Sequence, residues 1–154
     1  MKLQYIDLFC GAGGLGEGFT QSDFSSSFHI DSDPFSIETI KLREAYNYLS
    51  KENKLNKYYE YLRKCNGPFT SSEFCEQDNK LSAFLKRITS TQKITHDNID
   101  KIIETIKNSI GQSSNAVIIG GPPCQAYSHA KRSRMRKPTH GLQDEELKKA
   151  DEKN

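Results

Sequence analysis

Apolar residues are concentrated in short blocks near the two ends of the chain. Residues 3–9 (LQYIDLF) alternate between apolar and polar and then end in an apolar run, which is typical of a buried strand. Residues 26–30 predict a second strand, which leads directly into Asp31. Residues 116–119 (AVII) are short, apolar and rich in β-branched side chains, as expected of a central strand in a parallel sheet.

Helical patterns follow the first two of these blocks. A short helix is predicted over residues 17–21, and Asp33 followed by Pro34 is typical of a helix start. Apolar residues then recur at roughly helical spacing over residues 35–49, and residues 99–110 form another amphipathic pattern. The order strand, glycine-rich turn, helix, strand, helix predicts an α/β fold with a parallel sheet.

The middle of the chain has a different composition. Residues 50–95 are rich in Lys, Asn and Tyr and then in Ser and Thr, and they predict a polar helical insertion. We expect a turn at residues 66–68 and a further helix near residues 81–88. The tail after Pro138 is charged and predicts a helix over residues 144–150. The total of 154 residues is the length of one ordinary domain.

Composition narrows the class of protein. Only 34% of the residues are hydrophobic, and the mean hydropathy is −0.74. No apolar run approaches the ~18–20 residues that a membrane-spanning helix needs. Asp7 interrupts the first apolar stretch, which excludes a secretory signal there. These features predict a cytoplasmic protein.

Net charge and cysteines add little when taken alone. A net charge of +2 is too small to indicate a nucleic-acid partner, although residues 131–137 (KRSRMRK) include five basic residues. The four cysteines, Cys10, Cys65, Cys75 and Cys124, have no zinc-ligand spacing. We therefore expect no metal site and free thiols, one of which is a candidate nucleophile.

The turn after the first predicted strand has the spacing of a nucleotide-binding loop. Residues 11–16 (GAGGLG) match G-x-G-x-x-G, and Asp31 follows Gly11 by twenty positions. Glycines let a ligand approach the backbone, a helix N-terminus offers amide donors, and an acid at the second strand binds ribose hydroxyls. A nicotinamide dinucleotide and an adenosyl cofactor both remain compatible with this pattern.

The turn after the last predicted strand is more specific. Two glycines and two prolines, residues 120–123, come directly after the strand at residues 116–119. Proline fixes the backbone and glycine permits close approach, so Cys124 is held at the carboxyl end of a central strand. A thiol in that position is a candidate nucleophile, and the basic run from Lys131 lies close in sequence.

Together, the segments DLFCGAGGLGEGF (residues 7–19) and GGPPCQAYS (residues 120–128) resemble the DNA cytosine-5 methyltransferases. The resemblance implies an S-adenosyl-L-methionine-dependent methyltransferase fold, which is Rossmann-like, with an incomplete parallel sheet and a helical insertion. It implies that residues 1–154 are the N-terminal portion of a catalytic domain. It also implies a bacterial restriction-modification enzyme.

The resemblance assigns a set of residues to the cofactor. The residues that it places at the cofactor are Phe9, Gly11, Ala12, Gly13, Gly14, Leu15, Asp31, Ser32 and Pro123. Asp31 matches the acid that holds the ribose, while Ser32 stands where a larger apolar side chain often packs on the adenine. The acid that meets the adenine amino group corresponds to either Asp78 or Asp97, and this choice stays open.

The same resemblance makes Cys124 the catalytic residue. Its thiolate is expected to attack C6 of a cytosine that has flipped out of double-stranded DNA, because C5 is a poor nucleophile before that addition. The residues that it places at the DNA are Gln125 and Ser128, beside the flipped nucleotide, and Lys131, Arg132, Arg134 and Arg136, at phosphates.

Later parts of the family pattern are absent from this sequence, including the acid that protonates the cytosine ring and the target-recognition domain. We therefore expect a truncated gene product, a fragment or half of a split enzyme, inactive alone and dependent on a complementing C-terminal chain. The strand at residues 116–119 is then expected to have an exposed edge. The alternatives are a non-catalytic module that binds adenosyl cofactor or DNA and, less favoured, a nicotinamide-dependent oxidoreductase, which leaves the turn before Cys124 unexplained.

Overall fold

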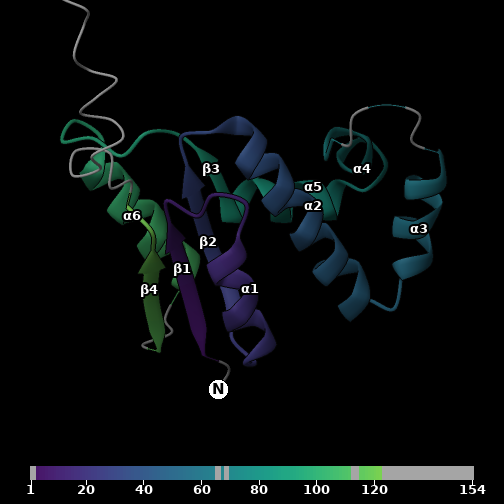
Figure 1. Ribbon diagram of the computed structural model, residues 1–154, viewed down its shortest axis with the longest axis horizontal. Helices are drawn as coiled ribbons and strands as arrows, with labels where there is room; N and C mark the ends of the chain where they lie inside the picture. The colour runs from purple at the N-terminus through teal and green to yellow at the C-terminus, as the bar shows by residue number, and fades with distance from the viewer. Residues whose placement is uncertain (1–2, 65–66, 68–69, 112–114, 123–154) are drawn as a thin grey trace, which may run out of the picture. The chain divides into compact units, whose positions relative to one another are not determined.

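The computed structural model describes residues 3–64, 67, 70–111 and 115–122 (Figure 1). Four strands form one parallel sheet in the order β3-β2-β1-β4. The elements in chain order are β1 (Gln4–Leu8), α1 (Gly14–Gln21), β2 (Ser25–Asp31), α2 (Pro34–Lys51), α3 (Leu55–Lys64), α4 (Ser72–Gln77), α5 (Asn79–Ile88), β3 (Thr89–Thr91), α6 (Ile99–Ile110) and β4 (Ala116–Gly120). This strand order, with the first strand inside the sheet, is that of a Rossmann-like α/β fold.

The two faces of the sheet are covered differently. On one face, Ile6 of β1 and Phe28 and Ile30 of β2 form a buried apolar cluster with Ile102 of α6. On the opposite face, α1 and α2 cover side chains that alternate with these, and His29 lies there with its Nε2 3.7 Å from Glu44 of α2. Burial on both faces is the usual condition of a parallel strand.

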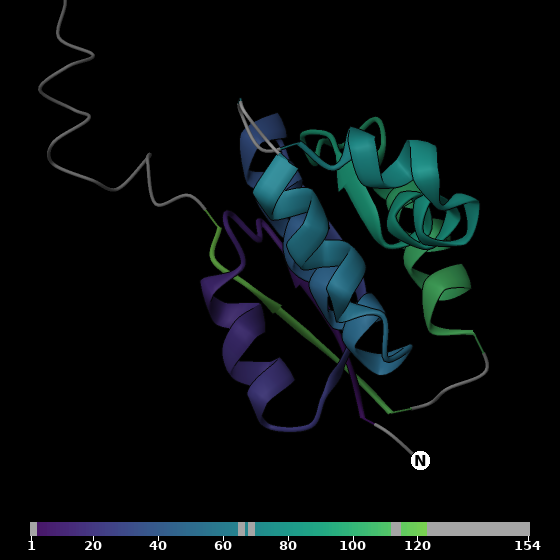
Figure 2. The same ribbon diagram turned by 90° about the vertical axis from the view of Figure 1, so that its right-hand side faces the viewer.

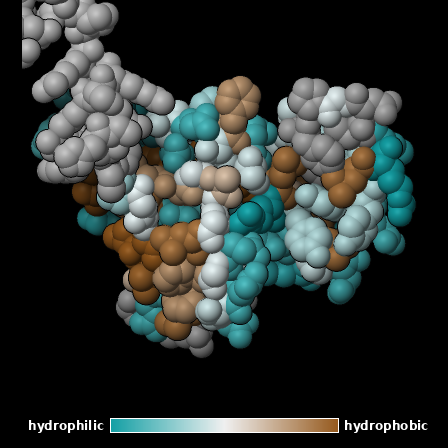
Figure 3. Space-filling view, in the orientation of Figure 1, coloured by the Kyte–Doolittle hydropathy of each residue, from teal (hydrophilic) through white to brown (hydrophobic). Residues whose placement is uncertain are grey.

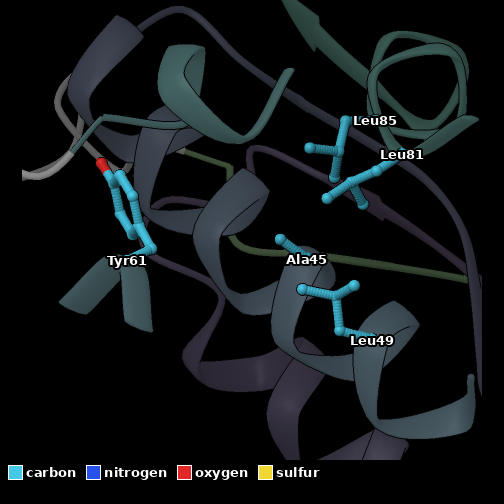
Figure 4. Close-up of a cluster of buried hydrophobic side chains, with 5 residues drawn as sticks. All are labelled: Ala45, Leu49, Tyr61, Leu81 and Leu85. Atoms are coloured by element: carbon cyan, nitrogen blue, oxygen red, sulfur yellow. The ribbon is translucent and has the colours of Figure 1, made fainter. Parts of the chain in front are cut away.

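The helices α3, α4 and α5 pack beside α2 and have a buried cluster of their own. Ala45 and Leu49 of α2 meet Tyr61 of α3 and Leu81 and Leu85 of α5 (Figure 4). Figure 2, which views the molecule from the side of these helices, shows them in front of the sheet. These helices are therefore attached to the sheet through α2 and also directly, because α5 contacts β2 and leads into β3.

Polar contacts reinforce this attachment. The Glu38 carboxylate on α2 accepts hydrogen bonds from the backbone N–H of Ser71 (2.9 Å) and from its hydroxyl (2.8 Å). The Tyr61 hydroxyl donates to the carbonyl of Thr70 (2.6 Å). The segment before α4 is thus tied both to α2 and to α3.

Most of the predicted elements are confirmed, with boundaries that shift by a few residues. The short helix predicted over residues 17–21 begins earlier, at Gly14. The strand β3 was missed, because Thr89–Thr91 falls within residues 50–95, where the sequence predicts a helical insertion. The predicted helix over residues 144–150 lies outside the described residues, as do two of the three positions of the predicted turn at residues 66–68.

The apolar residues that recur along α2 are not all buried. Ile37, Ile40 and Leu49 are buried, whereas Phe35 is 80% exposed and Tyr46 is 38% exposed. Among the described residues, no helix is long and apolar enough to cross a membrane.

We predict that Leu85→Ala lowers the free energy of unfolding by about 2–5 kcal/mol, because it removes a fully buried side chain from the cluster shared by α2, α3 and α5. Ile103→Ala, at a 42% exposed position of α6, is the matched control and should cost much less. Urea unfolding followed by circular dichroism measures both. Equal losses in the two variants would show that this cluster does not stabilise the fold.

Candidate functional site

The carboxyl ends of three strands bring the two glycine-rich turns together. Leu8 at the end of β1 pairs with Ile30 of β2 on one side and with Gly120 of β4 on the other. The turn that follows β1 therefore lies between Asp31 and Gly121. The carboxyl edge of an open parallel sheet is where ligands bind in such folds.

The turn from Phe9 to Gly13 has an unusual backbone. Phe9, Gly11 and Gly13 have φ values of 57°, 50° and 81°, and the N–H of Gly13 donates to the carbonyl of Cys10 (2.9 Å). A Cβ at Gly13 would overlap the side chain of Ile40 on α2. Glycine is thus required at position 13 by both conformation and packing, while Phe9 occupies a left-handed conformation that costs a non-glycine residue energy.

Asp31 holds this turn against the start of α2. Its Oδ2 accepts the backbone N–H of Gly11 (2.9 Å), and its Oδ1 accepts the backbone N–H of Asp33 (2.9 Å). Beside it, the N–H of Cys10 donates to the carbonyl of Ile30 (3.2 Å). A single carboxylate therefore connects the loop after β1 with the loop after β2.

Asp33 then caps α2, as its position before Pro34 predicts. Its carboxylate accepts the backbone N–H groups of Phe35 (3.1 Å) and Ser36 (3.2 Å) and the Ser36 hydroxyl (2.8 Å). The hydrogen bond from the Ser36 side chain, followed by that from the Phe35 backbone, holds the pKa of Asp33 below its usual value.

The N-terminus of α1 is open to a ligand. Its N-cap, Gly13, supplies no side chain to the first-turn amides, and a Cβ added at Gly11 or Gly14 would meet no atom within 4 Å. Arg43 of α2 donates from Nη1 to the carbonyl of Gly13 (2.7 Å) and pairs with Glu17 of α1 (3.3 Å), which fixes this helix end. Unpartnered amides beside open glycines form a setting for an anionic or polar ligand.

Buried polar side chains lie behind the turn. Asp7 is 1% exposed, and burial raises the pKa of its carboxyl group, while nearby His29 acts in the opposite direction. A Cβ at Gly16 would lie 3.1 Å from both Asp7 Oδ2 and the Tyr5 hydroxyl. Gly16 thus lets α1 pack closely on β1. The first turn of α1 therefore lies at the edge of the sheet.

The structure brings together the described members of the predicted cofactor set. Phe9, Gly11, Ala12, Gly13, Gly14 and Leu15 form the turn and the start of α1, and Asp31 and Ser32 lie beside it. The predicted residues that lie outside the described part of the chain are Pro123, Cys124, Gln125, Ser128, Lys131, Arg132, Arg134 and Arg136.

The two acids proposed for the adenine lie in different places. Asp78 caps α5, accepting the N–H groups of Lys80 and Leu81, and it lines a 230 Å³ cavity with Leu49. Leu49 is fifteen residues along α2 from its start beside Asp31, which is about 22 Å of helix. Asp97 is exposed in the connection from β3 to α6, which leaves the carboxyl edge.

Two residues near the site were missed by the sequence reasoning. Arg43 lies thirty positions after Gly13, and no motif connects them. Phe35 was not among the predicted site residues, and it is exposed in the first turn of α2, close in sequence to Asp31. Its position directly after the Asp33-Pro34 helix start was the available signal, because first-turn side chains project at the carboxyl edge.

Sequence relatives agree on one class of protein. A type II methyltransferase of Bacillus paralicheniformis is 39% identical over 145 residues, 85% of this chain and 33% of the relative. A type II methyltransferase of Thalassovita gelatinovora is 30% identical over 82% of this chain and 20% of the relative. The chain belongs to the type II methyltransferases.

The chain spans about a third of the length of the Bacillus methyltransferase that it matches and a smaller share of the Thalassovita one. A type II methyltransferase of Lysinibacillus sphaericus is 30% identical over 84% of this chain and 25% of the relative. No protein-family profile and no solved structure matches the chain.

We predict that the Cys10 thiol does not react with iodoacetamide in the folded chain at pH 8. Burial, with Asp7 and Asp31 nearby, raises its pKa to about 12, so only about one molecule in ten thousand carries the thiolate at that pH. Peptide mapping by mass spectrometry should find Cys10 modified only after unfolding in urea. Cys75, which is partly exposed, is the internal control. Rapid labelling of Cys10 before unfolding would contradict this placement.

Proposed function

We propose that this chain forms the cofactor-binding part of a DNA cytosine-5 methyltransferase that uses S-adenosyl-L-methionine. The observation that carries the proposal is the contact between Asp31 and the Gly11 amide at the carboxyl edge of the sheet, next to the turn that leads from β4 toward Cys124. The type II methyltransferases among its relatives support the proposal.

The residues at this edge suit an adenosyl cofactor. An ionised carboxylate offers about four acceptor positions, and the amides of Gly11 and Asp33 take one on each oxygen of Asp31. The remaining positions would accept ribose hydroxyls, while the free amides of Gly14 and Leu15 would bind the polar end of the cofactor. When bound, the cofactor supplies an activated methyl group on its sulfonium.

In this proposal Cys124 carries the chemistry at the base. Its thiolate would form a bond to C6 of a flipped cytosine, and the electron pair displaced from the C5–C6 double bond would make C5 nucleophilic enough to take the methyl group. The S–CH3 bond would break, leaving the cofactor as a neutral thioether. Transfer of the C5 proton to a base and departure of the thiolate would then restore the aromatic ring. Gln125 and Ser128 would line the base, and the cations from Lys131 to Arg136 would bind phosphates.

The exposed edge of the sheet supports a further partner. Within the described residues β4 pairs only with β1, and Val117 and Ile118 are 42% and 62% exposed. Figure 3 shows apolar surface over this part of the sheet. Leu3, directly before β1, is 45% exposed. Strands of parallel sheets are normally covered on both faces, and the relatives are much longer than this chain. A complementing methyltransferase segment that pairs with β4 would cover these side chains and supply the acid that protonates the cytosine ring.

A non-catalytic module that binds the adenosyl cofactor or DNA would use the same turn and the same Asp31. Such a module would differ in transferring no methyl group to DNA. The relatives reported above are methyltransferases, which gives the nicotinamide oxidoreductase hypothesis no support.

We predict that the chain binds S-adenosyl-homocysteine in isothermal titration calorimetry and that Asp31→Ala weakens this binding at least about tenfold. The substitution removes the ribose acceptor and also releases the Gly11 amide, and one lost charged hydrogen bond costs about 1.5–3 kcal/mol. Asp23→Asn is the matched control, because Asp23 is exposed and in a left-handed conformation that Asn tolerates. Unchanged affinity in Asp31→Ala would remove Asp31 from the cofactor site.

We predict that Cys124→Ser abolishes methylation in the presence of a complementing chain, whereas Cys75→Ser retains it. The first substitution removes the proposed nucleophile, and the second replaces a partly exposed thiol on α4. Digestion of the DNA to nucleosides and mass spectrometry should find 5-methylcytosine. Methylation at an exocyclic amino group of a base, or methylation by Cys124→Ser, would overturn the cytosine-5 assignment.

A further inference from the structure

Charge is divided unevenly between the two packed parts of the described chain. Residues 51–93, which contain α3, α4 and α5, carry nine lysines and arginines against five acidic residues. Residues 3–50 and 94–122, which contain most of the sheet and its covering helices, carry four against ten. The overall charge of +2 therefore conceals a basic helical insertion beside an acidic sheet.

The outer face of α3 concentrates this positive charge. The exposed residues of α3 are Asn56, Lys57, Tyr59, Glu60, Arg63 and Lys64. The opposite side of the helix, with Tyr58, Tyr61 and Leu62, packs on the cluster at α2 and α5. The outer face of α3 thus has three cations and one acid. Lys57, Glu60 and Lys64 also line the cavity that contains Asp78, whereas Arg63 does not.

These cations are unpaired, unlike those beside the sheet. Among the described residues, no acidic oxygen lies within 4.0 Å of Lys57, Arg63 or Lys64. By contrast, Lys41 and Arg43 on α2 each have a carboxylate partner, at 2.6 Å and 3.3 Å. The charge on α3 is therefore available to a partner outside this chain.

The helix itself explains only part of this pattern. Cations in the last turn, such as Arg63 and Lys64, stabilise a helix through its dipole. Lys57 lies in the first turn, where a cation is unfavourable for the same reason. The helix dipole therefore does not account for Lys57.

Aromatic hydroxyls accompany the cations. Tyr59 on the outer face of α3 is 41% exposed, and Tyr46 on α2 is 38% exposed. Both rings contact Tyr58, with centroid separations of 6.2 Å and 5.4 Å, so the three form a fixed group. Lysine, arginine and tyrosine side chains are among the groups that bind DNA phosphates without reading sequence.

We propose that the outer face of α3 binds the phosphate backbone of double-stranded DNA, separately from residues 131–137. The choice of DNA as the anionic partner rests on the proposed function. The contact is independent of sequence, and it adds affinity and orientation to whatever reads the target. A solvated helix face without a partner is the outcome that the experiment must exclude.

The experiment measures how binding of the full chain to a fluorescent, non-specific DNA duplex depends on salt. Arg63→Gln/Lys64→Gln is compared with Lys101→Gln/Lys107→Gln, which removes two exposed, unpaired cations from α6, one of them also in the last turn. The Arg63→Gln/Lys64→Gln variant should make the negative slope of log K against log[salt] shallower by up to about 1.8, since each phosphate contact contributes about 0.9 to its magnitude. The control pair should leave the slope near that of the wild type.

Equal slopes in both pairs and in the wild type would overturn the proposal, as would the absence of any duplex binding at low salt. Equal reductions in both pairs would also overturn it, because they would show a general charge effect. Thermal melting confirms that each variant is folded. The cofactor-binding titration is read separately in the same variants, so failure of the proposed function and failure of this DNA surface are distinguishable.

Discussion

The carboxylate of Asp31 makes the two hydrogen bonds on which the carboxyl edge of the sheet depends. One joins it to the Gly11 amide in the turn after β1, and the other to the Asp33 amide before α2. Since β1 and β2 are neighbouring parallel strands, this one side chain sets the separation of the loops that follow them. Asp33 then caps α2, so the start of that helix is fixed to the same point. The residue at the end of β2 must therefore have a short carboxylate side chain to make both hydrogen bonds, which restricts the amino acids that can occupy position 31.

The opening of α1 follows from this arrangement. With Gly11 held by Asp31 and the Gly13 carbonyl held by Arg43, the first-turn amides of α1 face outward beside glycines that have free space around them. The protein's own hydrogen bonds hold Gly11 and the Gly13 carbonyl, and the first-turn amides beside them are open to a ligand. The same edge receives the turn after β4, because Gly120 pairs with Leu8. Cofactor loop and proposed nucleophile loop therefore begin from adjacent strands.

The sequence predicted correctly those features that depend on a few neighbouring residues. Apolar strands, the glycine turn and the cap at Asp33 are each determined by a few neighbouring residues, and Asp31 was found by its spacing from Gly11. β3 was missed because Thr89–Thr91 has three hydroxyl side chains and no apolar one, so only its pairing with β2 makes it a strand. Arg43 and the exposed Phe35 depend on how α2 is rotated against the turn, which is set by tertiary packing on Ile37 and Ile40 and not by local spacing.

The central claim is that a cofactor binds against the backbone of the glycine turn. The most direct measurement is a ¹⁵N–¹H spectrum of the chain labelled at glycine, recorded with and without S-adenosyl-homocysteine. The account predicts that the amide signals of Gly13 and Gly14 shift with ligand, while those of Gly18, one turn further along α1, and Gly111, after α6, stay in place. Unmoved turn glycines, or equal shifts at all four positions, would contradict it.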